Sequence, residues 1–301
     1  MRIAMIGLGK MGLNMTRRLI KGGHQVVGCD RDGKAVTAAV RFGASRARTI
    51  KEAVAKLKAP RSVWLMIPAG EPVRAAVREL SALLDKGDIV VDGGNSLYKD
   101  DAEHVRVLGR QGIHYLDAGV SGGIWGLKEG YCLMIGGERR AFRTLEPVFK
   151  TLAPKNGYAH VGPAGTGHFV KMIHNGIEYA LMQAYAEGFE LLRSHPAKMD
   201  LRRIAGLWNR GSVVRSWLLE LIESALQKDP ELKSVAGYVP DSGEGRWTVQ
   251  EAVEAAVPVP TIALALFRRF RSRQKDAFSD KLLSALRGEF GGHAVRRKGR
   301  T

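Results

Sequence analysis

Short apolar runs alternate with amphipathic segments along the first half of the chain. We expect strands at residues 2–6, 25–29, 62–67, 89–92, 114–118, 131–136 and 158–161, and most of these runs are followed by apolar positions at helical spacing. Alternation of this kind is typical of a parallel sheet with helices packed on its faces.

The pattern changes near the glycine-rich segment 162–167. Beyond it we expect one long helix from Thr166 to about Arg193 and another from Thr261 to about Arg287. The sequence therefore predicts an α/β domain over residues 1–165 and an all-helical domain over 166–293. The basic tail, 294–301, is expected to be disordered.

A glycine-rich turn joins the first predicted strand to the first predicted helix, with Gly7, Gly9 and Gly12 in the pattern G-x-G-x-x-G. Glycines at this spacing allow a tight turn and let a pyrophosphate approach the helix N-terminus. A turn without a ligand is the alternative, but the flanking strand and helix favour binding. We predict a Rossmann-type domain whose loop binds a dinucleotide through Gly7, Leu8, Gly9, Lys10, Met11 and Gly12.

An acidic residue follows the second predicted strand. Asp30 is a suitable acceptor for hydrogen bonds from the adenosine ribose hydroxyls. Asp32 adds a negative charge that would repel the 2′-phosphate of NADP, and Arg31 offsets part of this repulsion. We expect these three residues at the adenosine ribose, with NAD as the preferred cofactor and NADP as a less preferred one.

Polar side chains gather on one side of the long helix predicted from Thr166. Five of them fall within an arc of roughly 140°: Lys171, His174, Asn175, Glu178 and Tyr179. We expect the opposite side, with Phe169, Val170, Ile173, Ile177 and Ala180, to pack against the protein. The alternative is a solvated face with ordinary ion pairs.

A lysine and a glutamate on one face, near a nicotinamide, can supply a base and an acid. Lys171 must then be partly neutral, which burial beside apolar or cationic groups favours because it lowers the pKa of an amine.

The net charge of +17 and the isoelectric point near 10.1 attract polyanions, so a basic nucleic-acid-binding or nucleotide-sensing protein is an alternative function. The charges are dispersed, and nucleic acid is not the expected partner. Cys29 and Cys132 show no metal-ligand spacing, and a chain of 301 residues needs no disulfide. Without a run of the roughly 20 apolar residues that span a bilayer, we expect a soluble cytoplasmic protein and no membrane partner.

Taken together, these motifs resemble the 6-phosphogluconate dehydrogenases from the N-terminus to about His293. The matching segments are GLGKMG at Gly7, DGGNS at Asp92, VSGGIWGLKEGYCLMIGG at Val120, GHFVKMIHNGIEY at Gly167, DSGEGRWT at Asp241 and RGEFGGH at Arg287. The chain looks like the short class, which lacks the second half of the helical domain of the longer enzymes. The resemblance implies oxidative decarboxylation of 6-phospho-D-gluconate to D-ribulose 5-phosphate and CO2 with reduction of NAD.

The resemblance also implies roles for individual residues. Lys171 would be the general base and Glu178 the general acid. The phosphosugar acid would be bound by Asn95, Ser121, Gly122, Gly123, His174, Asn175, Tyr179, Arg269, Arg287 and His293, and the cofactor also by Ile67, Pro68 and Asn95. No metal is expected, because a β-keto acid can lose CO2 without one.

In the family the tail reaches into the neighbouring subunit. The resemblance therefore implies a homodimer, or a dimer of dimers, in which Arg287 and His293 complete the partner's substrate site. An ordinary helix end, stopped by Gly291 and Gly292, is the alternative for this segment.

Some positions depart from the family pattern. Ser242 and Glu244 lie where the longer members have a phosphate-binding lysine and a threonine, and Arg246 is a candidate to compensate. Pro68 replaces a lysine that is usual beside the cofactor.

Other functions stay open at this stage. Another β-hydroxyacid dehydrogenase, acting on 3-hydroxyisobutyrate or tartronate semialdehyde, would share the glycine loop and the catalytic lysine but not the combination of Glu178, Tyr179 and Arg269. A catalytically inactive basic nucleotide-binding protein is a further alternative, which the intact pair Lys171 and Glu178 opposes.

Overall fold

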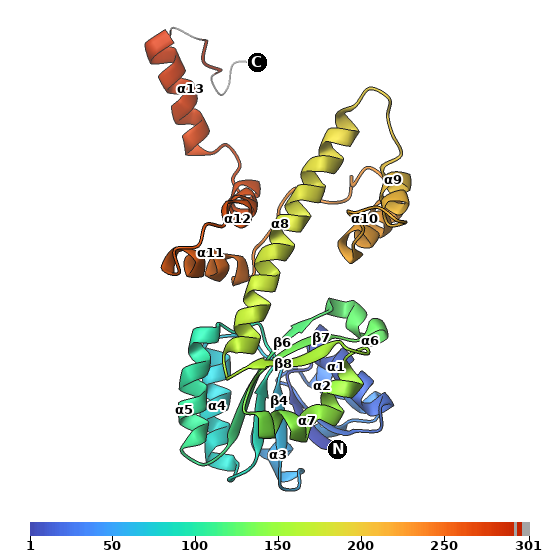
Figure 1. Ribbon diagram of the computed structural model, residues 1–301, viewed down its shortest axis with the longest axis vertical. Coiled ribbons are helices and arrows are strands. Elements are labelled where there is room, and N and C mark those ends of the chain that lie inside the picture. The colour runs from blue at the N-terminus through green and yellow to red at the C-terminus, as the bar shows by residue number, and fades with distance from the viewer. Residues whose placement is uncertain (292–293, 297–301) are drawn as a thin grey trace. The chain divides into compact units, whose positions relative to one another are not determined.

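The computed structural model describes residues 1–291 and 294–296 (Figure 1). The chain divides into two compact units, Met1–Asn175 and Gly176–Thr301. The division lies inside the long helix α8 (Thr166–Ser194), whereas the predicted domain boundary coincides with the start of that helix.

Unit 1 is built on one eight-stranded sheet of order β3-β2-β1-β4-β5-β6-β7-β8. Its strands are β1 (Arg2–Ile6), β2 (Gln25–Cys29), β3 (Ser45–Ala47), β4 (Ser62–Leu65), β5 (Ile89–Asp92), β6 (His114–Ser121), β7 (Cys132–Gly137) and β8 (Tyr158–Gly162). Neighbouring strands pair in parallel, except that β6 and β7 are antiparallel, with Leu116 opposite Gly137. The predicted α/β fold is confirmed, and β3 is a strand that the sequence pattern did not predict.

Helices cover both faces of the sheet, as Figure 1 shows. They are α1 (Lys10–Lys21), α2 (Gly33–Arg41), α3 (Ile50–Ala55), α4 (Glu71–Leu83), α5 (Asp101–Gly109), α6 (Gly126–Glu129) and α7 (Arg139–Leu152), with 3-10 turns at Tyr98–Asp100 and Gly123–Trp125. One apolar core lies under α1, α2 and α7 and the other under α3, α4 and α5. Because both faces are covered, β1, β4 and β5 consist almost wholly of buried residues.

Unit 2 is helical, as predicted. After α8 it contains α9 (Leu201–Trp208), α10 (Trp217–Lys228), α11 (Glu244–Glu254), α12 (Pro260–Ser272) and α13 (Phe278–Gly291). Its buried clusters are small, and one of them contains Tyr179, Ala265 and Leu266.

The single helix predicted from Thr261 to Arg287 is wrong. Two helices, α12 and α13, occupy this segment, and Asp276 between them has a φ of 58°, a left-handed conformation that a helix cannot continue through. Arg271 secures the break, since its Nη1 donates to the carbonyl oxygen of Gln274 and its Nη2 pairs with Asp280.

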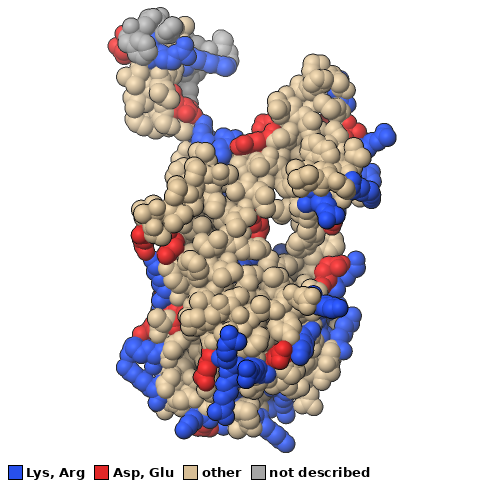
Figure 2. Space-filling view, viewed as in Figure 1, with Lys and Arg blue, Asp and Glu red and all other residues tan. Residues whose placement is uncertain are grey.

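In the described part of the chain, no helix has the length and apolar character that a membrane crossing requires. Lys and Arg side chains are scattered over the face in Figure 2, with acidic side chains among them. This face shows no continuous basic stripe.

Candidate active site

The glycine loop between β1 and α1 is shaped by close backbone contacts. A Cβ at Gly7, whose φ is +94°, would lie 2.3 Å from the Met66 carbonyl oxygen, and one at Gly12 would lie 2.0 Å from the Gly7 carbonyl oxygen. A Cβ at Gly9 would meet no atom within 4 Å. Gly9 is also the N-cap of α1, where free N–H groups attract an anion. The loop thus fits a dinucleotide pyrophosphate, with open space at Gly9.

Asp30 is fixed at the carboxyl end of β2 by backbone donors. Its Oδ2 accepts a hydrogen bond from Leu8 N at 2.5 Å, and its Oδ1 accepts one from Asp32 N at 2.8 Å. The Asp32 carboxylate accepts from Lys34 N and caps α2, and Arg31 is exposed. Each Asp30 oxygen keeps a lone pair for a ribose hydroxyl.

The loops after β1, β4 and β5 meet at the same sheet edge. A Cβ at Gly7 would lie 2.9 Å from Ile67 Cγ2, and one at Gly94 would lie 2.9 Å from the Ile67 carbonyl oxygen. Pro68 follows Ile67, and both Pro68 and Asn95 are exposed. Ile67 and the loop that carries Asn95 are thereby brought next to the glycine loop.

The turn after β6 presents the Ser121, Gly122 and Gly123 backbone. Gly122 and Gly123 have φ values of +135° and +53°, which explains why both are glycine. Ser121 Oγ lies 3.3 Å from His174 Nε2, and His174 Nδ1 lies 3.1 Å from Asn175 Oδ1. Three of the predicted substrate residues therefore form a connected polar group in unit 1.

Lys171 is buried beside this group, with 7% of its surface exposed. A Cβ at Gly119 in β6 would lie 2.5 Å from Lys171 Cβ, so α8 crosses the strand with almost no space between them.

The apolar side predicted for this helix is only partly packed. Val170 and Ile177 are 37% and 50% exposed, whereas Asn175 and Tyr179 on the polar side are buried. The polar side can pack because the residues that face it are glycines, Gly119 in β6 and Gly245 in α11. A Cβ at Gly245 would lie 2.5 Å from the Tyr179 ring. The alternative of a solvated polar face is therefore wrong for Lys171, Asn175 and Tyr179.

Tyr179 belongs to a cationic cluster in unit 2. The Arg269 guanidinium carbon lies 3.5 Å from the centre of its ring, and Ser242 N donates to its hydroxyl oxygen at 3.3 Å. Arg269 Nη1 also donates to the Pro240 carbonyl oxygen at 2.9 Å. Glu178, one residue earlier, is half-buried.

Arg246, the candidate to replace the missing lysine, is bound to an acid. Asp241 Oδ2 accepts from Arg246 Nε at 2.5 Å, and Asp241 Oδ1 accepts from Arg273 Nη2 at 2.9 Å. The hydrogen bond from Arg246 lowers the pKa of Asp241. Glu244 is buried, and its Oε2 accepts from Ser242 Oγ at 2.6 Å.

The predicted tail residues are only partly described. Arg287 is an exposed residue of α13, and the helix ends at Gly291. His293 lies outside the described residues.

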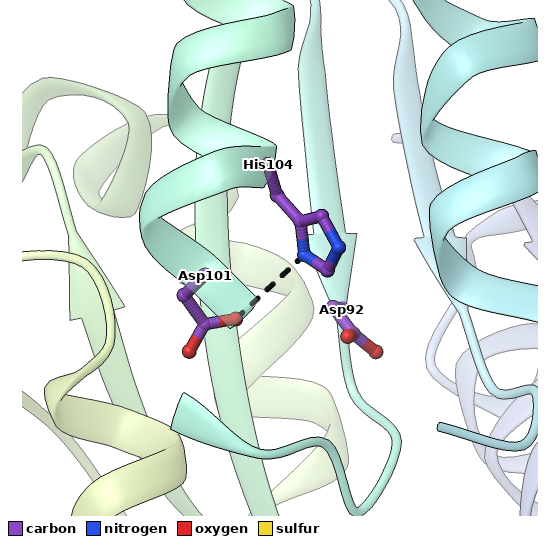
Figure 3. Close-up of side chains that lie close together, drawn as sticks. All are labelled: Asp92, Asp101 and His104. Carbon is purple, nitrogen blue, oxygen red and sulfur yellow. Dashed lines mark ion pairs between the residues drawn. The ribbon is translucent and has the colours of Figure 1, made fainter. Parts of the chain in front are cut away.

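Unit 1 contains a buried network of carboxylate and imidazole side chains that the sequence motifs did not predict. Asp92, Asp101 and His104 offer ligand atoms within 4.8 Å of one another (Figure 3). Asp101, Asp117 and His168 form a second group of this kind. These residues come from two strands and two helices, β5, β6, α5 and α8, and only Asp101 and His104 are close together in the sequence. Their oxygens already accept hydrogen bonds, for example Asp92 from Gly94 N and Ser96 Oγ. We therefore assign them to a hydrogen-bonded network and not to a metal.

The sheet, the glycine loop and the acidic residue after β2 define a nicotinamide dinucleotide-binding domain of the dehydrogenase type. Residues 2–162 match the family model of the NAD binding domain of 6-phosphogluconate dehydrogenase, and residues 167–281 match the model of its C-terminal domain. The chain belongs to the 6-phosphogluconate dehydrogenase family.

Individual relatives agree with this assignment. The chain is 46% identical over 300 residues to the NAD(+)-dependent, decarboxylating 6-phosphogluconate dehydrogenase of Haloferax volcanii. The matched region covers 99% of this chain and 99% of the relative. A Bacillus subtilis protein with the provisional name 6-phosphogluconate dehydrogenase YqeC is 46% identical over 298 residues, or 99% of this chain and all of the relative. The structure of Plasmodium falciparum 6-phosphogluconate dehydrogenase, studied with NADP+ and with its substrate, superposes with a TM-score of 0.82 at 28% identity. It covers 100% of this chain and 67% of that one, as expected for a short member.

Proposed function

We propose that this chain oxidises and decarboxylates 6-phospho-D-gluconate to D-ribulose 5-phosphate and CO2, with NAD as the hydride acceptor. The observation that carries the proposal is the burial of Lys171 against Gly119 of β6, beside the Ser121–His174 pair. A solvated lysine would stay protonated at neutral pH, whereas one in this position can act as a base. Identity over almost the full length of an NAD(+)-dependent relative supports the same reaction.

Lys171 takes the proton of the substrate C3 hydroxyl as hydride leaves C3. The resulting 3-keto acid loses its carboxylate as CO2, while protonated Lys171 stabilises the negative charge that develops on the C3 oxygen. Glu178 then donates a proton to C1 of the enediol, which gives the ketose. Ser121 and the Gly122 and Gly123 N–H groups bind the departing carboxylate, and Asn95, His174 and Asn175 bind the sugar hydroxyls.

The phosphate is assigned to Tyr179 and Arg269, with a further cation from Arg287 of the partner subunit. A dianion requires several donors, and Ser242 and Glu244 supply no positive charge. Arg246 is close by but shares Asp241 with Arg273, which favours a role in holding the cluster together. His293 of the partner subunit is assigned to the same site by family resemblance.

NAD is proposed as the preferred cofactor because Asp30 is held at the ribose end of the glycine loop. Two backbone N–H groups orient its carboxylate, so it cannot easily rotate away from a 2′-phosphate. The Haloferax volcanii relative carries NAD(+) in its name, whereas the Plasmodium falciparum structure was studied with NADP+.

A substrate comparison tests the proposed reaction. NADH formation is followed by its absorbance with 6-phosphogluconate, gluconate and 3-hydroxyisobutyrate, each with NAD, and Lys171→Ala serves as the inactive control. We expect 6-phosphogluconate to give by far the highest kcat/KM. A higher kcat/KM with 3-hydroxyisobutyrate would assign the chain a different β-hydroxyacid substrate.

A complementation experiment tests the shared site. Lys171→Ala and Arg287→Ala chains are mixed, and mixed dimers are verified with two different affinity tags. One site in each mixed dimer then has both Lys171 and Arg287, so activity should exceed that of either variant alone. Verified mixed dimers without restored activity would show that Arg287 does not act across the subunit boundary.

A further inference from the structure

A buried ion pair lies at the start of the helix that carries Lys171. His168 is 2% exposed and Asp101 is fully buried, and His168 Nδ1 lies 3.0 Å from Asp101 Oδ1 and 2.9 Å from Oδ2. Burial by itself lowers the pKa of His168, but the hydrogen bonds and negative charge of Asp101 raise it to about 9. Asp101 thus favours the protonated form of His168, whose Nε2 has no hydrogen-bond partner among the described residues.

The pair is embedded in further hydrogen bonds. Tyr115 OH donates to Asp101 Oδ1 at 2.7 Å and lies 3.2 Å from His104 Nδ1. Figure 3 shows the Asp101 carboxylate, in the first turn of α5, joined by a dashed line to the His104 ring, with Asp92 at the end of the neighbouring strand. Charged groups at this depth are costly and need such partners. Nothing in the proposed reaction uses these groups directly.

The same network anchors the first turn of α8 to the sheet. Asp117 in β6 accepts from Gly165 N at 2.8 Å and from His168 N at 2.9 Å, so it binds two N–H groups at the helix start. Phe169 packs edge-on against Tyr98 at 5.0 Å between ring centres. The helix is thus held at His168 by α5 and β6 together.

Lys171 lies one helical turn beyond His168. Residues three apart are neighbours on a helix surface, so a movement of His168 moves the lysine with it. Gly119 leaves no room on the sheet side, where a Cβ would lie 2.7 Å from the Gly167 carbonyl oxygen as well as 2.5 Å from Lys171 Cβ. The distance of Lys171 from β6 is therefore set by the attachment of the first turn of α8 to that strand.

We propose that His168, clamped by Asp101, is a positioning residue that fixes Lys171 for proton abstraction. The role rests on the proposed function, since it gives Lys171 its reacting geometry. His168 itself touches neither substrate nor cofactor. An apolar replacement would leave Asp101 buried with Tyr115 as its remaining side-chain donor and would loosen the first turn of α8.

The main test compares His168→Leu with His24→Leu. His24 is also a buried histidine of unit 1, with Nε2 at 2.9 Å from Thr151 Oγ1, so the control has a similar general cost of losing an imidazole. We expect His168→Leu to lower kcat about 10- to 100-fold, as small misplacements of reacting groups do, with little change in the KM for 6-phosphogluconate or the Kd for NAD. His24→Leu should keep its kcat. Because Gln can still donate to Asp101, His168→Gln should regain part of the lost kcat.

A second measurement does not depend on turnover. Trace labelling of amines with acetic anhydride, quantified for Lys171 by peptide mass spectrometry, reports how accessible and how neutral this lysine is. Labelling of Lys171 should change severalfold in folded His168→Leu and stay at the wild-type rate in His24→Leu. If His168→Leu does not fold, the same comparison is made with His168→Gln.

The two outcomes separate the inference from the reaction. Wild-type labelling and wild-type kcat in a folded His168 variant would overturn the positioning role. Altered labelling in a protein that shows no turnover of 6-phosphogluconate at all would instead contradict the proposed substrate and leave the clamp on Lys171 supported.

Discussion

Replacing Gly9 by alanine separates cofactor binding from folding. A Cβ at Gly9 meets no atom within 4 Å, and its φ of −61° and ψ of −171° suit any residue. Nothing in the protein by itself requires glycine there, so a loss of NAD affinity in Gly9→Ala would come from contact of the methyl group with the ligand. Gly7 and Gly12 are less informative, because a Cβ at either position collides with the backbone.

The expected size of the effect follows from the lost contacts. A methyl group at Gly9 would hold the pyrophosphate away from the N–H groups at the start of α1. Loss of one charge-assisted hydrogen bond costs about 1.5–3 kcal/mol, which raises the Kd for NAD roughly 10- to 150-fold. The folded state should lose less than about 1 kcal/mol, the usual range for a change at an N-cap.

Calorimetric titration with NAD and a thermal melt of the same sample measure both quantities. Gly33→Ala is the matched control, since Gly33 also begins a helix and a Cβ there also meets no atom within 4 Å. Gly9→Ala should lose NAD affinity and Gly33→Ala should not. An unchanged Kd in Gly9→Ala would refute the assignment of the pyrophosphate to this loop.

Three further predictions concern residues beyond the loop. Lys171→Ala should lower kcat by about 10²- to 10⁴-fold with an unchanged Kd for NAD, whereas near-normal turnover would remove the lysine from the mechanism. Asp30→Asn should raise kcat/KM with NADP relative to NAD more than Asp32→Asn does, and a wild-type preference for NADP would contradict the role of Asp30. The third prediction concerns stability. Because the pKa of His168 is raised from 6.5 to about 9, its contribution is fully present below pH 6.5 and is lost as pH rises through 9. The contribution is about 3 kcal/mol at most, since burial also raises the pKa of Asp101 and cancels part of it. The melting-temperature difference between wild type and His168→Leu should therefore shrink from pH 6 to 10, and a difference that grows would refute the ion pair.

Local patterns predicted most of unit 1. The bounds of β1, β2 and β5 follow from short apolar runs, and the glycine loop follows from its spacing between a strand and a helix. The segment Ser45–Ala47 was missed because β3 is a short edge strand with only Ala47 buried, which leaves almost no apolar signal.

Failures of the sequence interpretation arise where tertiary contacts decide. The polar side of α8 packs because Gly119 and Gly245 have no side chains in its way. These glycines lie in distant elements, so the periodicity of the helix itself could not predict this contact. The network of Asp101, Asp117 and His168 likewise joins residues far apart in the chain. One local signal did exist, because Asp101 and His104 share the side of α5 that carries the buried Leu108. Charged groups at such a position indicate a buried polar network.

The most direct test of the proposed reaction is the stoichiometry of its products with purified wild-type protein. Samples with 6-phosphogluconate and limiting NAD are analysed for NADH by absorbance, for CO2 by a coupled carboxylase assay and for the ketose phosphate by mass spectrometry. Oxidation at C3 followed by loss of the carboxylate predicts one CO2 and one ribulose 5-phosphate for every NADH. NADH formed without an equal amount of CO2 would contradict a decarboxylating dehydrogenase.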